Sequence, residues 1–193
     1  MQKKSYYIIN AITAYRLLAA PVLFILILEK QVDLFKWLLA ISFLTDAIDG
    51  FLARYYKVAS AFGAKLDSIA DDLTVLVGLV GLVIYKPDFV RSVLYLLILL
   101  FVIFILQNIL AYRRYGKATS FHTYLAKIAA VFQGSFLILS FFTADPLYPL
   151  FYAAIGITLV ELIEEIILVL VLSKWEINVK GLYWVLKRNK SKA

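Results

Sequence analysis

Six apolar segments, each close to the length of a membrane-crossing helix, constrain this chain more than any other feature. They run over about residues 11–28, 34–54, 62–85, 90–112, 124–143 and 150–172. An α-helix needs about 20 apolar residues to cross the hydrocarbon core of a bilayer. With 63% hydrophobic residues, the 193-residue chain is also more apolar than an ordinary soluble domain. We therefore predict an all-α integral membrane protein, a six-transmembrane-helix bundle that forms a single domain over residues 1–193.

The basic residues give the chain a formal net charge of +7 and predict its orientation. They gather at the start, around the second and fourth connections and in the tail, at Lys3, Lys4, Arg16, Arg54, Lys57, Lys65, Arg113, Arg114, Lys117, Lys174, Lys180, Lys187, Arg188, Lys190 and Lys192. Cytoplasmic loops carry an excess of lysine and arginine, so we predict cytoplasmic termini. Clustering at the ends of apolar segments indicates anionic headgroups rather than nucleic acid as the partner.

Two terminal segments carry further expectations. Asn10, Thr13 and Arg16 interrupt the first apolar run, which favours a retained first helix over a signal peptide. The tail holds Trp175 and Trp184 among its lysines, a pattern typical of an amphipathic helix on headgroups. The chain has no cysteines, which excludes disulfides and thiolate metal sites.

Aspartates inside the second and third segments are the main departure from a lipid-facing pattern. One acidic residue at mid-membrane costs roughly 2.5–3.5 kcal/mol, so such residues need partners or a polar cavity. Asp46 and Asp49 lie three residues apart, and Asp67 and Asp71 lie four apart. Both separations place a pair on one helix face, one turn apart. Two adjacent antiparallel helices would bring the pairs together.

Four clustered carboxylates require positive charge nearby. The nearest basic residues along the sequence are Arg54 and Lys65, which are too few to neutralise them. Like charges packed together disfavour one another's ionisation. Divalent cations resolve this, and ligation by oxygen alone favours Mg²⁺ or Mn²⁺ over zinc. An acidic pathway of a divalent-cation transport protein is the alternative from a different class.

The residues between the aspartates complete a fixed pattern, which reads Asp46-x2-Asp49-Gly50-x2-Ala53-Arg54-x8-Gly63-x3-Asp67-x3-Asp71. Glycine and alanine keep the helix surface small, and an arginine suits a phosphate. This pattern resembles the signature of the CDP-alcohol phosphotransferase (CDP-alcohol phosphatidyltransferase) family at every position. The six-segment pattern extends the resemblance over nearly the whole chain.

The resemblance implies a reaction and assigns roles to residues. The family transfers a phosphoalcohol group from a CDP-alcohol, here CDP-diacylglycerol, to a second alcohol and releases CMP. It implies two Mg²⁺ or Mn²⁺ ions held by Asp46, Asp49, Asp67 and Asp71, with Asp71 also the base. It implies contacts to the CDP moiety from Asn10, Thr13, Gly50, Arg54 and Ser60. In the same family pattern, Arg16 would line the donor pocket with Asn10 and Thr13.

The sequence identifies the acceptor alcohol less specifically than the donor. The first segment is similar to the branch that makes phosphatidylglycerophosphate and cardiolipin, which implies glycerol 3-phosphate. The third segment departs from that branch because it lacks a proline and a lysine after the third and fourth aspartates. Phosphatidylglycerol, inositol phosphate and serine are therefore alternative acceptors. Lys117 and Lys127 are the candidate residues for binding a phosphate group of the acceptor.

Several other polar residues could have either a functional or a structural role. The glutamates of the sixth segment, Glu161, Glu164 and Glu165, support either an acceptor-pocket role or pairing with an intramembrane base such as Lys127. His122 is typical of a hydrogen-bonded interface residue rather than a catalyst. Asp72 lies about 100° round the helix from Asp71, which favours a supporting role. The resemblance also implies a homodimer in the bacterial inner (cytoplasmic) membrane, with its active site on the cytoplasmic side.

Overall fold

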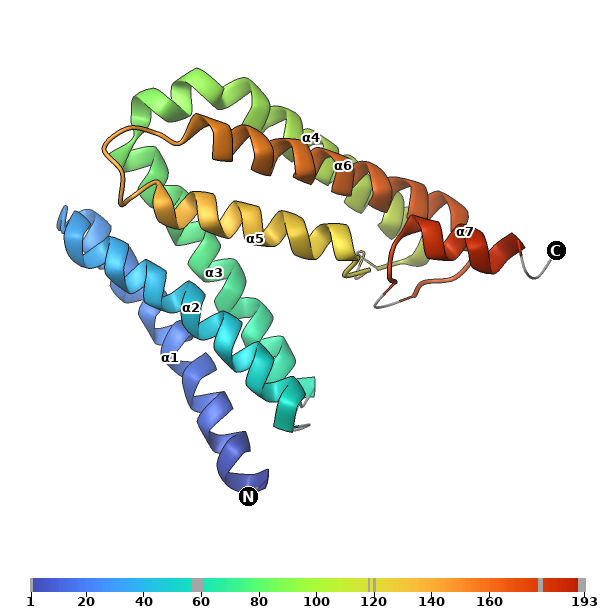
Figure 1. Cartoon of the computed structure of the whole chain (residues 1–193), viewed down its shortest axis with the longest axis horizontal. Coiled ribbons are helices and arrows are strands. Elements are labelled where there is room, and N and C mark those ends of the chain that lie inside the picture. Colours follow the sequence, from blue (N-terminus) through green and yellow to red (C-terminus); the bar gives the residue numbers. More distant parts are fainter. Residues whose placement is uncertain (1, 57–60, 118, 120, 177–178, 191–193) are drawn as a thin grey trace. The chain divides into compact units, whose positions relative to one another are not determined.

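The computed structural model describes the backbone of residues 2–56, 61–117, 119, 121–176 and 179–190. Side chains are described at residues 14–46, 48, 69–117, 119, 121–176 and 179–190. In these ranges every regular element is a helix: α1 (Gln2–Leu28), α2 (Val32–Tyr56), α3 (Ala61–Tyr85), α4 (Pro87–Tyr115), α5 (Tyr124–Leu139), α6 (Tyr148–Val171) and α7 (Leu182–Lys190) (Figure 1). The all-α prediction is confirmed, and each of the six apolar segments lies largely on one of the helices α1 to α6.

Membrane-crossing length and hydropathy are met by one helix among the described residues. This helix is α4, Pro87–Tyr115, whose 29 residues exceed the span of the hydrocarbon core. Shorter apolar helices cover Ala14–Leu28 and Tyr124–Leu139. The prediction of six spans therefore remains a prediction for the other helices.

Two helices begin or end at residues other than the limits of their apolar segments. α1 begins at Gln2, well before the apolar run, because polar residues continue a helix as readily as apolar ones. α5 ends at Leu139, although the apolar run extends to residue 143. There the chain tightens into a turn, with the N–H of Phe141 bonded to the carbonyl of Ile138. The Lys86 ammonium then donates to the carbonyls of Thr143 and Ala144.

Two compact units make up the chain. Unit 1 comprises Met1–Val90 and Leu137–Pro146, and unit 2 comprises Arg91–Phe136 and Leu147–Ala193. In unit 1, α1 packs against both α2 and α3. This three-helix arrangement brings the middle parts of α2 and α3, which carry Asp46 and Asp71, beside α1.

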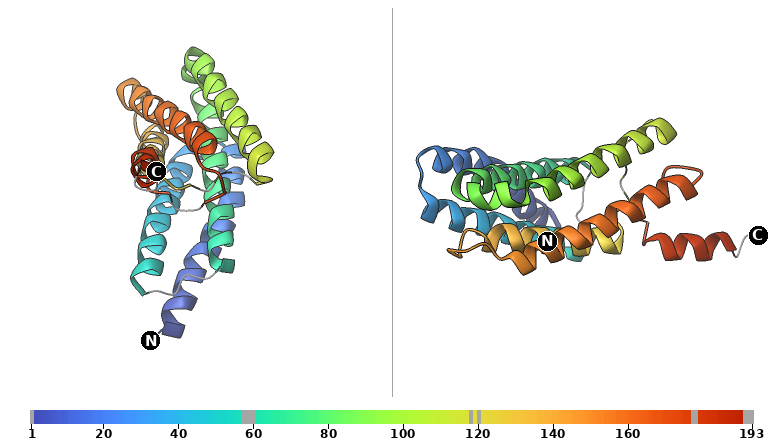
Figure 2. Two further views of the ribbon diagram at one scale, coloured as in Figure 1. Left: turned by 90° about the vertical axis from the view of Figure 1, so that its right-hand side faces the viewer. Right: turned by 90° about the horizontal axis from the view of Figure 1, so that it is seen from above.

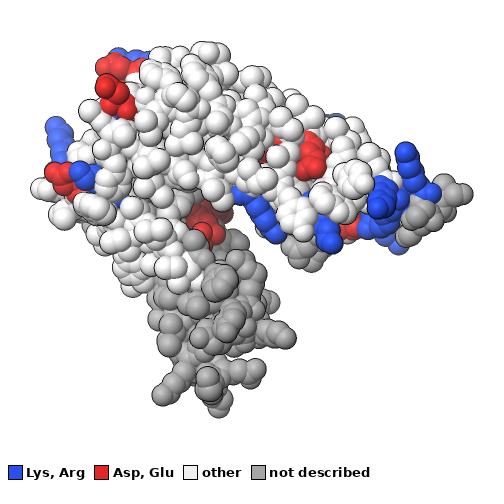
Figure 3. All heavy atoms as spheres, viewed as in Figure 1, with Lys and Arg blue, Asp and Glu red and all other residues white. Residues whose placement is uncertain are grey.

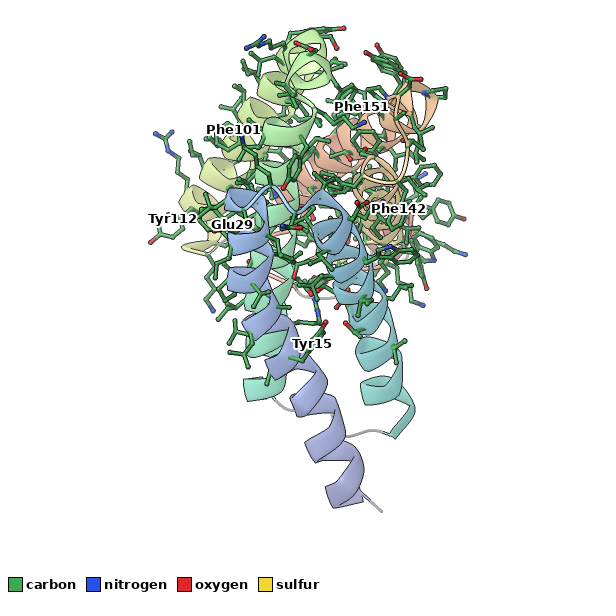
Figure 4. All side chains as sticks on the ribbon, turned by 90° about the vertical axis from the view of Figure 1, so that its left-hand side faces the viewer. Tyr15, Glu29, Phe101, Tyr112, Phe142 and Phe151 are labelled. Atoms are coloured by element: carbon green, nitrogen blue, oxygen red, sulfur yellow. The ribbon has the colours of Figure 1, made fainter. Side chains whose placement is uncertain are left out.

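Aromatic packing closes the other end of unit 1. Phe35 of α2 is fully buried, and its ring centroid lies 4.9 Å from that of Phe141 and 5.8 Å from that of Tyr85. The Tyr85 hydroxyl donates to the carbonyl of Leu26 at 3.2 Å, which ties α3 to α1. Phe142 lies beside α2, where its ring meets that of Trp37 edge-on (Figure 4). These contacts fix the three helices relative to one another.

In unit 2, a buried cluster joins the ends of α4 and α6 to the C-terminal helix. Its members are Ala111, Phe121, Leu168, Val169, Leu172, Val179 and Val185. The Tyr115 hydroxyl donates to the carbonyls of Val169 and Leu172, both at 2.9 Å, and Arg114 Nε donates to Leu172 at 3.2 Å. These bonds satisfy carbonyls that the end of α6 leaves without helical partners. α7 then follows beside the end of α6 (Figure 2).

Candidate active site

A buried arginine marks the polar centre of unit 1. The Arg16 side chain, on α1, is only 1% exposed. One guanidinium nitrogen lies 2.8 Å from Asp46 Oδ1 on α2, and another is paired with Asp71 Oδ1 on α3. A planar guanidinium presents several donors in fixed directions, which suits it to bridge two carboxylates. Arg16 therefore brings the first and the last aspartate of the motif to one point.

This pairing changes the charge balance expected from the sequence. Along the sequence, Arg54 and Lys65 are the nearest cations to the motif, whereas the structure supplies Arg16 from another helix. A signal for this role was present, because Arg16 is the sole charged residue between positions 5 and 28. A charge in an apolar segment needs a partner, and the motif aspartates are the nearest intrasegment acids in the sequence. The separation of Arg16 from Asp46 along the chain hid the pair.

The two paired aspartates are partly exposed. Side-chain exposure is 36% for Asp46 and 40% for Asp71, while the arginine between them is buried. Ser42 and Ala70, on α2 and α3, are fully buried. Small side chains allow backbones to approach closely. Arg16 thus contacts one oxygen of each carboxylate from the buried side, while both aspartate side chains keep exposed surface.

The chemistry of this donor set fits a divalent cation. Mg²⁺ and Mn²⁺ prefer oxygen ligands, and two carboxylates from two helices converge here. Asp49 lies on α2 one turn after Asp46, and Asp67 lies on α3 one turn before Asp71. The side chains of Asp49 and Asp67 lie outside the described residues. Among the side chains that are described, no three metal-binding groups gather in one place.

Other predicted donor contacts also lie outside the described part of the chain. These are the side chains of Asn10, Thr13, Gly50 and Arg54, and the whole of Ser60. Their roles stay predictions. Asp72 is described and exposed, and it does not share the ion pairs of its neighbour Asp71.

The two lysines predicted to bind the acceptor lie in unit 2, and each stands over an aromatic ring. Lys117 Nζ is 4.8 Å from the ring centroid of Trp175, and Lys127 Nζ is 5.5 Å from that of Tyr124. Cations at this distance are attracted by the ring's quadrupole. Both side chains are exposed. Their proposed contact with an acceptor phosphate stays a prediction.

Of the glutamates on α6, Glu165 has partners that the sequence interpretation missed. Glu165 Oε2 accepts hydrogen bonds from Gln107 Nε2 at 2.7 Å and from Thr119 Oγ1 at 3.0 Å. Gln107 is fully buried on α4. Pairing with Lys127 is therefore wrong for Glu165, because an amide and a hydroxyl already satisfy it. The intramembrane amide of Gln107 was the available signal.

Glu164 has a different role, at the start of the C-terminal helix. Its Oε1 accepts the backbone N–H of Leu182, the first residue of α7, at 2.9 Å. A carboxylate in that position satisfies one of the free N–H groups of a helix start. Pairing with Lys127 is therefore wrong for Glu164 too.

His122 is exposed and has a φ of 50°, a conformation that histidine adopts more often than most residues.

Sequence comparisons connect this site to known proteins. The CDP-alcohol phosphatidyltransferase family model matches residues 6–175. A CDP-diacylglycerol–glycerol-3-phosphate 3-phosphatidyltransferase of Cereibacter sphaeroides is 45% identical over 75 residues, 37% of this chain and 34% of the relative. The Rickettsia typhi protein of the same name is 36% identical over 95 residues, 47% of this chain and 51% of the relative.

A relative with a different acceptor is also similar to part of the chain. A CDP-diacylglycerol–inositol 3-phosphatidyltransferase of Saccharomyces cerevisiae is 38% identical over 66 residues, 34% of this chain and 30% of the relative. The chain spans about a third to a half of the length of these relatives. No solved structure matches the chain. Family proteins are membrane proteins and generally depend on divalent metal ions. With the family model covering residues 6–175, the chain belongs to the CDP-alcohol phosphatidyltransferase family.

Proposed function

We propose that this protein transfers a phosphatidyl group from CDP-diacylglycerol to glycerol 3-phosphate and releases CMP. The observation that carries the proposal is the convergence of Asp46 and Asp71 on the buried guanidinium of Arg16. These are the first and last aspartates of the family pattern, contributed by two helices. The match to the family over residues 6–175 and the names of the bacterial relatives support the donor and the acceptor.

The reaction is a displacement at phosphorus. The acceptor hydroxyl oxygen attacks the phosphorus that carries diacylglycerol, and the bond from that phosphorus to the CMP oxygen breaks. Asp71 accepts the hydroxyl proton as general base. Its carboxylate is held at one oxygen by Arg16, which fixes its direction. Orientation of this kind lowers the barrier because the reacting groups no longer need to find each other.

The same carboxylates are proposed to bind the metal ions. Asp46, Asp49, Asp67 and Asp71 would hold two Mg²⁺ or Mn²⁺ ions, which supply charge neutralisation at the diphosphate. Arg16 adds a fixed positive charge beside Asp46 and Asp71. Asn10, Thr13, Gly50, Arg54 and Ser60 are proposed to contact the CDP moiety. Lys117 and Lys127 are proposed to bind the acceptor phosphate.

The cellular setting follows the family. We place the protein in the bacterial inner membrane as a six-span homodimer, with cytoplasmic termini and the active site on the cytoplasmic side. The length and apolar character of α4 and the excess of basic residues near its C-terminal end support this orientation. CDP-linked donors and CMP are then on the side where nucleotides are available.

A CMP-release screen tests the proposed acceptor. Purified protein in detergent receives CDP-diacylglycerol, Mg²⁺ or Mn²⁺, and one alcohol from a panel of glycerol 3-phosphate, phosphatidylglycerol, inositol, inositol phosphate and serine. We expect the highest rate with glycerol 3-phosphate and none after chelation. Inositol as the preferred acceptor would reassign the substrate while keeping the reaction, as the yeast relative's name suggests. Divalent-ion flux into proteoliposomes without nucleotide, and no CMP release, would favour the transport alternative.

A further inference from the structure

The C-terminal helix α7 has one packed face and one open face. Val185 is 3% exposed and belongs to the core cluster of unit 2, and Leu182 packs beside it. Lys187, two residues after Val185, lies about 160° round the helix and is exposed. Tyr183 and Trp184 flank this open face, with exposures of 66% and 45%. The apolar side of α7 is therefore already used by the protein itself.

The start of α7 is fastened to α6 through Glu164. The carboxylate accepts the N–H of Leu182 at 2.9 Å, as described above. Gly181, just before the helix, has a φ of 146°, in a region that favours glycine. A Cβ at Gly181 would lie 3.0 Å from Glu164 Oε1, so the absence of a side chain lets the carboxylate reach the helix.

The other half of α7 is fastened to the chain that precedes it. The Arg188 guanidinium donates to both oxygens of Glu176, each at 2.9 Å. The ring of Trp184 lies 5.4 Å from that of Tyr124, and the carbonyl of Lys180 accepts the N–H of Tyr124. Contacts at both ends hold α7 in one orientation, so its open face is fixed rather than free to turn.

Along the axis of α6, α7 lies near the C-terminal end of that apolar helix. Glu164 precedes the end of α6 at Val171 by seven residues, about 10 Å of helical rise. The end of α4 lies at the same end of unit 2, because Arg114 and Tyr115 bond to Leu172. α7 is thus level with the last turns of α4 and α6, where a membrane protein meets the headgroups.

The surface around α7 is strongly basic. Besides Arg188, which pairs with Glu176, its exposed cations are Arg113, Arg114, Lys117, Lys174, Lys180, Lys187 and Lys190. Lysine and arginine gather at this end of unit 2 in Figure 3. The nearby acids are engaged, since Glu176 pairs with Arg188 and Glu164 bonds to Leu182. Cations interleaved with tyrosine and tryptophan are the side chains that anionic bilayer interfaces favour.

We propose that the open face of α7, formed by Tyr183, Trp184, Leu186, Lys187 and Lys190, is a docking surface for the anionic headgroups of the bilayer. The sequence pattern predicted an amphipathic tail on the headgroups. The structure assigns the apolar residues Leu182 and Val185 to internal packing, so the attraction is electrostatic, with aromatic anchoring. The five residues of this face are none of those proposed to bind metal, donor or acceptor, so the proposal does not depend on the proposed reaction.

A single spin label on the open face tests the proposal. The chain has no cysteines, so Leu186→Cys provides the sole thiol for labelling. The labelled protein is placed in nanodiscs of phosphatidylcholine alone or mixed with phosphatidylglycerol, and the accessibility of the label to a water-soluble nickel complex is measured. We expect accessibility to fall by about fivefold in the anionic discs and to recover in high salt.

Two pairs of variants separate charge from structure. K187E/K190E is expected to remove the dependence on anionic lipid, whereas K187R/K190R keeps it. Glu164→Ala is expected to loosen α7 and increase the mobility of the label, whereas Glu164→Gln keeps an acceptor for Leu182 and preserves the order.

Three outcomes would overturn the proposal. Equal accessibility in both kinds of disc would exclude recognition of anionic lipid. Shielding in detergent that rises with protein concentration would show that a second copy covers α7. Shielding in phosphatidylcholine discs on addition of inorganic phosphate would show a site for soluble anions instead. The primary measurement uses Leu186→Cys alone, so a charge variant that fails to fold does not remove the test.

Discussion

At the scale of single residues, the buried Arg16 links the helices that carry the aspartates. A charge with 1% exposure is stable in an apolar helix only when it is paired, and Arg16 is paired with Asp46 and Asp71. The same bonds fix the directions of a proposed metal ligand and the proposed base. If the proposed roles of Asp46 and Asp71 hold, substitutions of Arg16 should affect both stability and activity.

Replacement of Arg16 tests this double role. We expect R16Q to lower kcat by about 100-fold, because small misplacements of reacting groups cost about that much. R16K should recover part of the rate, since an ammonium keeps the charge but lacks the planar fork that reaches two carboxylates. Mn²⁺ affinity is measured alongside CMP release, and R91Q, at an exposed arginine, is the matched control. Full kcat and unchanged Mn²⁺ affinity in R16Q would contradict the positioning role.

Glu165 gives a second prediction at this scale. Glu165→Ala leaves the fully buried Gln107 without its carboxylate partner, which costs about 1–3 kcal/mol for an unsatisfied buried group. Glu165→Gln keeps an oxygen that accepts from Gln107 and Thr119, so its loss of stability should be smaller. Thermal unfolding in detergent measures both variants. Equal stability of Glu165→Ala and the parent protein would show that the hydrogen bonds contribute nothing net.

At the scale of elements, α3 carries the proposed base near its middle and packs closely against other elements near its C-terminal end. Asp71 faces Arg16 near the middle of the helix, while Gly81 lies near its C-terminal end, against buried aromatic rings. A Cβ at Gly81 would lie 2.7 Å from Phe35 Cζ and 3.3 Å from Phe141 Cζ. The glycine therefore allows α3 to approach α2 and the segment after α5. Packing at this end holds the helix that carries the proposed base.

Two glycines of α3 give a graded prediction. Gly81→Ala pushes against Phe35, a fully buried ring held by two neighbours, and should destabilise the protein by about 1–3 kcal/mol. Gly78→Ala would place a Cβ 2.6 Å from Cδ2 of Leu137, a single aliphatic side chain that can change rotamer more easily than a ring between two others, so a smaller loss is expected. Gly156→Ala on α6 has open space and serves as control. In detergent, the unfolding temperature should be lowest for Gly81→Ala, intermediate for Gly78→Ala and highest for Gly156→Ala. A lower unfolding temperature for Gly156→Ala than for Gly81→Ala would contradict the packing argument.

At the scale of the whole molecule, sequence pattern and structure contribute different parts of the account. Apolar segment length predicted six helices because helix formation and burial in lipid are local demands. The spacings of Asp46 to Asp49 and of Asp67 to Asp71 placed each pair on one helix face for the same reason, and adjacency of the two helices predicted that the pairs converge. The structure brings Asp46 and Asp71 together at Arg16. The pairing of Arg16 with those aspartates was not predicted, because it joins positions far apart in the chain. The partners of Glu164 and Glu165 were missed likewise, since an amide, a hydroxyl and a backbone N–H carry no charge pattern.

The most direct test of the central claim is CMP release from CDP-diacylglycerol in the presence of glycerol 3-phosphate and Mg²⁺ or Mn²⁺. The protein should release CMP only when donor, acceptor and metal are all present. Asp71→Asn should lower kcat by about 100-fold or more, the contribution of a general base. Asp145→Asn, at an exposed aspartate outside the site, should leave the rate unchanged. CMP release by Asp71→Asn at the rate of the parent protein would contradict the proposed base, and no release from any CDP-alcohol would contradict the proposed reaction.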